Sequence, residues 1–205
     1  MKKIFALIAL FALNACTSYT QADVIRFHDA NVLKTGTFII LPNDKQKTGL
    51  EYKEYARQIA EHMTAYNFTQ VATKEKADYA LYFSYGLKRS ELHTEAVPFN
   101  TTFHGGYNSG PYGYYGRPYF GGHDVYTYTR YVRNLEMDIV DLKQSSGQNI
   151  VKAFEGEVTS EGESDNFFTV SKCMINAMFS GFPGKNGEKK TVTMKAAECR
   201  AGEAE

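Results

Sequence analysis

The stretch that decides the fold is ADYALYFSYGLK, residues 77–88. Large side chains stand at every second position, and the residues between them are mostly smaller or more polar. Successive side chains of a β-strand point to opposite faces, so this alternation predicts a strand with one buried face. The large residues of that face are Tyr79, Leu81, Phe83, Tyr85 and Leu87.

A helix and a second strand precede this stretch. Apolar side chains recur every three or four residues over 52–66, which predicts one apolar helical stripe. The sequence from Thr48 to Glu51 fits a capping box at the start of that helix. The continuous apolar run TFIIL at 37–41, ended by Pro42, indicates a strand buried on both faces. The order strand, helix, strand predicts a right-handed crossover with the helix on one side of a sheet.

The remaining elements complete one domain over residues 24–182. Alternating segments at 24–28, 126–142 and 149–159 predict further strands, the last two joined by a polar turn. A broad apolar surface over 167–178 predicts a second helix. The expected fold is therefore α+β, a mainly antiparallel sheet of about five strands with two helices packed on it. Residues 183–205 are expected to form a polar C-terminal tail, in which 191–194 is a candidate for a short strand.

The N-terminus has the pattern of an export signal. Residues 1–15 begin MKK and continue with about ten apolar residues, too few to span a bilayer. The following LNAC resembles the lipobox of bacterial lipoproteins, which implies acylation of Cys16 at the head of a linker, 16–23. A free cysteine and ordinary cleavage after Ala22 are the alternatives. Thr17 is not the aspartate of an inner-membrane retention signal, so we expect an outer-membrane lipoprotein facing the periplasm, held in the bilayer by its acyl chains.

Charge and cysteine content restrict the possible partners. Without residues 1–15 the chain keeps 21 basic and 23 acidic side chains, so it has no basic footprint for nucleic acid. Export places the protein in an oxidising compartment, where Cys173 and Cys199 are candidates for a disulfide. Two unpaired cysteines are the alternative.

A Gly/Tyr-rich insert, residues 93–124, separates two central strands. Seven glycines and two prolines between His104 and His123 disfavour a helix. The insert is interpreted as a mobile loop, as a contact surface for an envelope protein or glycan, or as a metal site that would use His93, His104 and His123. Two histidines that bracket eighteen residues lack metal-finger spacing, so we predict no metal and no cofactor. The candidate contact residues are Tyr107, Tyr112, Tyr114, Tyr115, Tyr119 and Phe120.

Motifs of catalysis are weak. There is no Gly-x-Ser-x-Gly nucleophile elbow, and acylation would occupy Cys16. Asp138 and Asp141 are three apart on a predicted strand, so their side chains point to opposite faces. Asp141 is expected to start the turn that follows. We predict no enzyme, with a small-ligand or metal-binding module as the alternative and a hydrolase as the least favoured function.

The order of elements resembles the bacterial exported proteins, often lipoproteins, grouped as domain of unknown function 4136. The resemblance covers residues 24–180. It rests on the lipobox, the strand before Pro42, the Ala77-Asp78 strand entry, the MDIVD strand at 137–141, and an aromatic before a small residue at 154–156. Phe154 stands where members commonly have tryptophan. The resemblance to this family implies an exported location and a fold, but no activity. We expect a non-enzymatic interaction or structural module of the cell envelope.

Overall fold

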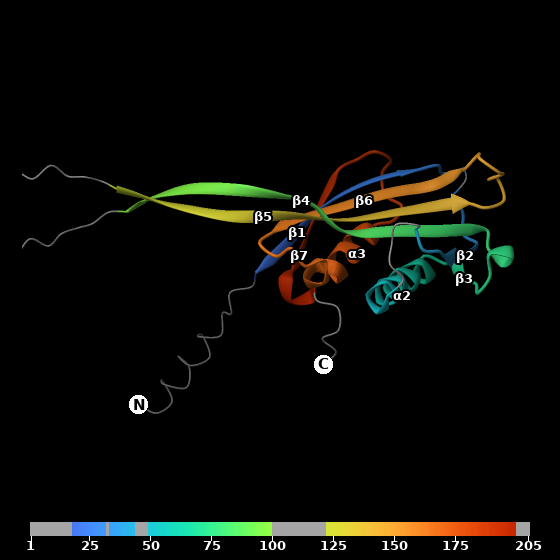
Figure 1. The fold of residues 1–205 in the computed structure, drawn as a ribbon. Helices are drawn as coiled ribbons and strands as arrows, with labels where there is room; N and C mark the ends of the chain where they lie inside the picture. Colours follow the sequence, from blue (N-terminus) through green and yellow to red (C-terminus); the bar gives the residue numbers. More distant parts are fainter. Residues whose placement is uncertain (1–17, 32, 44–48, 100–121, 200–205) are drawn as a thin grey trace, which may run out of the picture.

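The computed structural model describes residues 18–31, 33–43, 49–99 and 122–199. These residues form one mixed sheet with two α-helices on one side of it (Figure 1). The strands are β1 Tyr19–His28, β2 Thr37–Ile40, β3 Thr69–Gln70, β4 Tyr79–Phe99, β5 Gly122–Asp141, β6 Lys152–Gly162 and β7 Lys190–Lys195. The helices are α2 Leu50–Ala65 and α3 Ser171–Phe179, with short 3-10 turns η1 Lys74–Lys76, η2 Phe167–Val170 and η3 Ala196–Glu198.

The sheet has seven strands in the order β3-β2-β4-β5-β6-β1-β7. β2 pairs in parallel with β3 and with β4, and the other pairs are antiparallel. The α+β class is thus confirmed, but the expected sheet of about five strands is too small. β3 has only two residues, too few for a recognisable pattern, and β7 contains the candidate strand 191–194 of the expected tail, outside the expected domain bounds.

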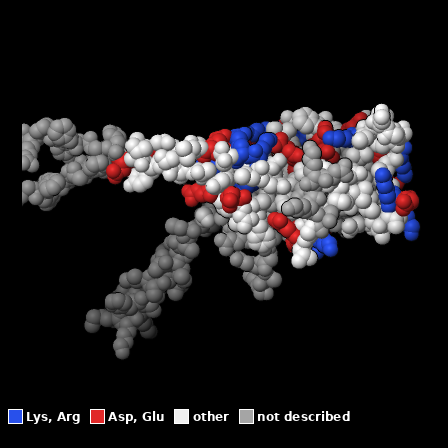
Figure 2. All heavy atoms as spheres, viewed as in Figure 1, with Lys and Arg blue, Asp and Glu red and all other residues white. Residues whose placement is uncertain are grey.

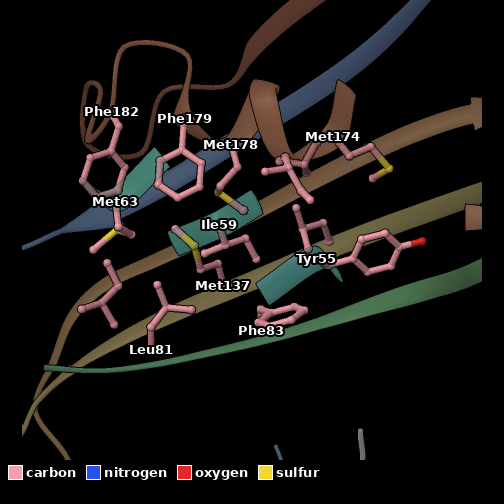
Figure 3. Packing of buried hydrophobic residues seen from close by; sticks show 14 of the residues in the cluster. Tyr55, Ile59, Met63, Leu81, Phe83, Met137, Met174, Met178, Phe179 and Phe182 are labelled. Carbon is pink, nitrogen blue, oxygen red and sulfur yellow. The ribbon is translucent and has the colours of Figure 1, made fainter. Parts of the chain in front are cut away.

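The core lies between the sheet and the two helices. Leu81 and Phe83 of the predicted buried face of β4 point into it and are almost completely buried, whereas Leu87, at the end of that face, is 48% exposed. Tyr52 of α2 stacks on Phe83 with ring centroids 4.6 Å apart. Figure 3 shows side chains of α2 facing those of β4 across this space. The helical stripe and the period-two stripe therefore meet, which is how the sequence pattern becomes tertiary packing. The stripe of α2 buries Tyr52, Tyr55, Ile59, Ala60 and Met63.

The start of α2 differs from the expected capping box. The helix begins at Leu50 with Gly49 as N-cap, a residue without a side chain to cap it, and Thr48 lies outside the described residues. Glu51 instead accepts a hydrogen bond from the Tyr55 hydroxyl at 2.8 Å. Tyr55 lies one turn further along the helix. The Glu51 carboxylate therefore binds a side chain on the helix surface and not a free amide at the helix start.

The second predicted helix is divided into η2 and α3. Asn166, before η2, accepts a hydrogen bond from the Phe168 amide, and α3 begins at Ser171. The apolar residues that predicted the helix are buried, as their broad distribution indicated. They are Phe167, Val170, Cys173, Met174, Ala177 and Met178.

The C-terminal segment is held against the domain. β7 pairs with β1 along six residue pairs, from Tyr19–Lys195 to Val24–Lys190. Cys199, just after it, forms a disulfide with Cys173 of α3, and both side chains are buried. The described part of the expected polar tail therefore adds an edge strand to the sheet. The candidate strand at 191–194 is thus confirmed, and its pairing extends it by one residue at each end.

Candidate functional site

β4 and β5 form a hairpin that is much longer than the rest of the sheet. Their pairing runs from Tyr79–Asp141 to Phe99–Gly122. β2 meets β4 only as far as Leu81, and β6 meets β5 only as far as Tyr131. Beyond these points residues 89–99 and 122–130, here called the arm, project as a two-stranded ribbon (Figure 1). The expected insert 93–124 thus begins and ends inside paired strands.

The arm leaves the body of the domain at a bulge. The β4–β5 register shifts between Leu87 and Arg89, so Lys88 is an extra residue of β4. Gly86, just before it, has φ of +150°, which side chains rarely adopt. A bulge increases the local twist and bends the bulged strand. This short segment therefore sets the direction in which the arm projects.

The two faces of the arm differ in chemistry. Val125, Thr127 and Thr129 follow the same alternation along β5 as the core residues Leu135, Met137 and Ile139. Their cross-strand partners are Ala96, Thr94 and Leu92. These six residues, here called the neutral face, are uncharged and form the continuation of the helix-covered side of the sheet.

No helix covers the neutral face among the described residues, and Leu92 and Val125 are 72% and 63% exposed. The opposite face carries Glu91, His93, Glu95, Tyr126, Tyr128 and Arg130. Figure 2 shows the visible surface of the arm as mostly free of charged residues. A two-stranded ribbon on its own is only marginally stable in water, so the exposed neutral face suits contact with a partner.

Most of the predicted site residues lie outside the described part of the chain. This holds for Cys16, for His104 and for the tyrosines and Phe120 of the insert. The residues of the neutral face that sequence reasoning did not single out are Leu92 and Val125. Their signal was the alternating β-branched and aromatic pattern VYTYT at 125–129, which continues past the length that the body of the sheet needs.

The described histidines are separate from one another. His93 stacks on Tyr128, with ring centroids 5.7 Å apart. His28 of β1 instead makes a 3.1 Å hydrogen bond between Nε2 and the Gly184 carbonyl. In the part of the chain that the structure describes, no three His, Cys, Asp or Glu side chains form a metal-binding group.

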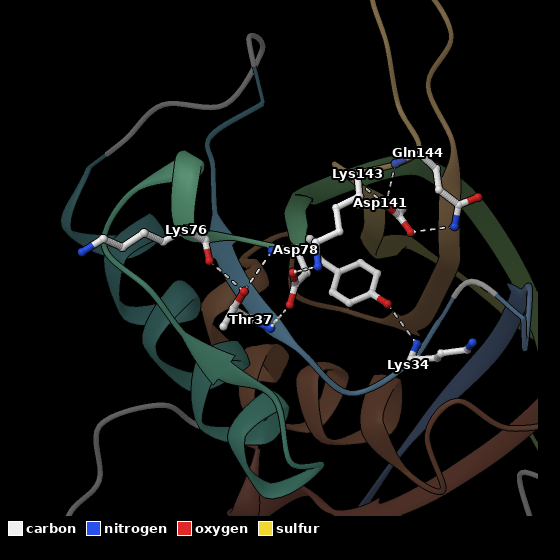
Figure 4. Close-up of polar contacts among 8 residues, drawn as sticks. Lys34, Thr37, Lys76, Asp78, Asp141, Lys143 and Gln144 are labelled. Carbon is white, nitrogen blue, oxygen red and sulfur yellow. Dashed lines mark hydrogen bonds and ion pairs between the residues drawn. The ribbon is translucent and has the colours of Figure 1, made fainter.

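A second polar cluster joins β2 to the start of β4 (Figure 4). The Thr37 amide donates to Asp78 Oδ2 at 2.8 Å, and the Thr37 hydroxyl donates to the Lys76 carbonyl at 2.8 Å. Lys143 Nζ lies 2.5 Å from Asp78 Oδ1. The Lys143 ammonium and the Thr37 amide lower the pKa of Asp78 to about 2. Asp78 is therefore a carboxylate that holds two strands and a turn together.

Asp141 starts the β5–β6 turn, as predicted. Its Oδ1 accepts the amides of Lys143 and Gln144 at 2.8 and 2.9 Å. A groove beside this turn is lined in part by Tyr82, Asp138 and Lys152. Lys152 Nζ pairs there with Asp138 at 3.0 Å. Asp78 and Asp138 are thus each paired with a lysine within the protein, which is typical of structural interactions and leaves the arm as the candidate site.

None of the described helices has the length and hydrophobicity needed to cross a bilayer.

Comparisons with solved structures found several chains that are similar to this one. A DUF4136 family protein from Bacteroides thetaiotaomicron VPI-5482 is 18% identical, with 80% of this chain and 97% of that chain covered and a TM-score of 0.46. A PDZ domain protein from Parabacteroides distasonis ATCC 8503 is 11% identical over 94% of this chain, with a TM-score of 0.47, and this chain spans only 42% of it.

A PelC dodecamer from Paraburkholderia phytofirmans is 11% identical, with 80% of this chain and 99% of that chain covered and a TM-score of 0.41. No curated protein matches the chain. The family profile described as domain of unknown function DUF4136 matches residues 20–184, which is most of the sequence and contains every strand except β7 and the first residue of β1. The protein is therefore a member of the DUF4136 family.

Proposed function

We propose that this protein is a lipid-anchored module of the bacterial outer membrane, facing the periplasm, that works through protein contacts made by its arm and not through catalysis. The export signal and the lipobox at Cys16 support the address. The absence of a nucleophile elbow from the sequence supports a role in binding.

The observation that carries the proposal is the neutral face of the arm. In the body of the domain this side of the sheet is covered by helices, whereas in the arm Leu92 and Val125 remain exposed. Among the described residues, the outer edges of β4 after Leu81 and of β5 before Tyr131 also pair with no strand. The neutral face between two open backbone edges favours a protein partner, because a protein can supply both uncharged side chains and strand hydrogen bonds.

Photocrosslinking in intact cells tests this contact. A photoreactive amino acid at Val125 should give discrete protein adducts, whereas one at the exposed Lys53 of α2 should not. Leu92→Lys places a charge on the neutral face and should remove the adducts. Tyr126→Lys places the same charge on the opposite face and should leave them. Adducts that protease does not shorten would indicate a glycan, and equal yields from positions 125 and 53 would refute the arm as the contact surface.

Membrane fractionation tests the anchor separately. The unchanged protein should sediment with outer-membrane vesicles and carry acyl chains at Cys16 by mass spectrometry. Cys16→Ser should release it into the soluble periplasmic fraction, because the folded domain would have no other attachment. Retention of the Cys16→Ser protein in the outer membrane would contradict lipid anchoring without affecting the arm.

A further inference from the structure

A basic hollow lies away from the arm, where β1 meets the segment that follows α3. Its lining includes Arg26, Ser180, Lys185, Glu188, Lys189 and Lys190. Four of these side chains are cations and one is a carboxylate. The hollow therefore has a positive balance in a chain whose total charge is zero.

Arg26 is the buried cation of this hollow, with only 4% of its surface exposed. Its Nη2 donates to the carbonyls of Ala177 and Ser180 at 3.0 and 3.1 Å, at the C-terminal end of α3. A helix C-terminus offsets only about half of a unit charge. The Nε group is buried without a hydrogen-bond partner among the described residues. Buried guanidinium groups normally have their donors satisfied, so one donor here is left over.

The other buried arginine provides an internal comparison. Arg133 uses all three of its nitrogens: Nε donates to the Ser160 carbonyl, Nη2 to the Ser160 hydroxyl and Nη1 to the Ser164 carbonyl, at 3.4, 3.4 and 3.2 Å. Burial lowers the pKa of both arginines. Each nitrogen of Arg133 thus donates a hydrogen bond despite its burial, whereas the Nε group of Arg26 has no partner among the described residues.

The lysines around Arg26 are not equivalent. Lys189 is paired with Asp23 at 2.7 Å, and Lys185 lies 3.5 Å from Glu188. Lys190 pairs in register with Val24, two residues before Arg26 on β1, so its side chain lies on the same side of the sheet. Its Nζ is 3.5 Å from the Ser180 hydroxyl, the only hydrogen bond found for it among the described residues. Arg26 and Lys190 are therefore the two cations that face the hollow without a carboxylate.

The backbone of the segment also fits closely around the guanidinium. Gly184 has φ of +85°, and a Cβ at this position would lie 2.8 Å from Arg26 Nη1. A side chain there would displace the arginine, so glycine keeps the hollow open beside it.

We propose that this hollow binds a phosphate group, held by Arg26 and Lys190 with the Ser180 hydroxyl as a further donor. A guanidinium supplies a planar fork of donors and an ammonium supplies a mobile charge, a combination that matches the oxygens of a dianionic phosphate. The same chemistry would recognise a soluble phosphate or the headgroup of a phospholipid. This site is independent of the arm and of its proposed protein partner.

Titration of the full mature chain with Cys16→Ser tests the site, with inorganic phosphate as one probe and phosphatidylglycerol vesicles as the other. Calorimetry should detect phosphate binding, and the NMR signal of the Arg26 Nε–H should shift during the titration. Lys190→Gln should weaken binding by about tenfold, as loss of one charged hydrogen bond predicts. Lys53→Gln removes the same charge on the exposed face of α2 and should leave binding within about twofold.

The two probes separate the possible sources of the phosphate. Binding of free phosphate that depends on Lys190 supports a soluble ligand, and binding of vesicles alone with the same dependence supports a lipid headgroup. Arg26→Lys, checked for folding by circular dichroism, should weaken whichever probe binds. The proposal is overturned if neither probe binds at millimolar phosphate, or if Lys190→Gln and Lys53→Gln weaken binding equally.

Discussion

The disulfide between Cys173 and Cys199 has a calculable effect on stability. It joins α3 to the residue that follows β7 and η3, across a sequence separation of 26. The edge strand β7 has mostly exposed side chains, so few apolar contacts hold it. Reduction of the bridge is therefore the perturbation that should most weaken the attachment of the C-terminal segment.

The magnitude follows from chain entropy. A loop of this length removes conformational freedom from the unfolded chain worth about 3.5 kcal/mol at 25 °C. For a domain of this size, about 1 kcal/mol shifts the midpoint of thermal unfolding by roughly 2–4 °C. Reduction should thus lower the melting temperature by roughly 7–14 °C.

The assay compares urea and thermal unfolding with and without reductant, followed by circular dichroism. The double variant Cys173→Ala, Cys199→Ala is the control, because reductant should not change its stability. Non-reducing peptide mapping should also show residues 173 and 199 in one linked peptide pair. If the unchanged protein gives the same free energy of unfolding, within about 0.5 kcal/mol, under both conditions, the entropic argument is wrong.

Three further changes act on other parts of the fold. The pKa of Asp78 is lowered from 3.8 to about 2. Its contribution to the free energy of unfolding is therefore present above about pH 4 and is lost as the pH falls toward 2. Urea unfolding of Asp78→Asn at a series of pH values should lack that acid-dependent loss. Phe83→Ala should lower the free energy of unfolding, measured in urea, by about 3–5 kcal/mol, whereas Phe168→Ala at a partly exposed position should lower it by less than about 1 kcal/mol. Gly86→Val should cost about 1–3 kcal/mol, because its φ of +150° strains a β-branched residue, and thermal unfolding measures the loss.

Periodicity predicted most of the core. The alternation around Leu81 and the helical repeat around Ile59 each indicated one apolar face, and both residues are completely buried. Such patterns are local, so they survive in the sequence without knowledge of partners. Recognition of the family from the order of these elements is confirmed as well.

Local patterns did not reveal what depends on distant pairing. The expected loop 93–124 contains strand residues at both ends, because β4 and β5 continue to pair where no core demands it. The alternation at 191–194 indicated a short strand, but not that it pairs with the edge of β1. Backbone hydrogen bonds between distant segments do not identify their partners in the sequence of side chains.

The sequence by itself determined the α+β class, the two helices and the apolar faces, together with the expectation of an exported lipoprotein. Those features depend on local spacing and on short motifs near the N-terminus. Only the tertiary structure decided the strand order, the exposure of Leu92 and Val125, and the burial of Arg26 beside Lys190. Exposure and charge pairing are set by which segments meet in space, and residues separated by more than 150 positions contact one another around Arg26.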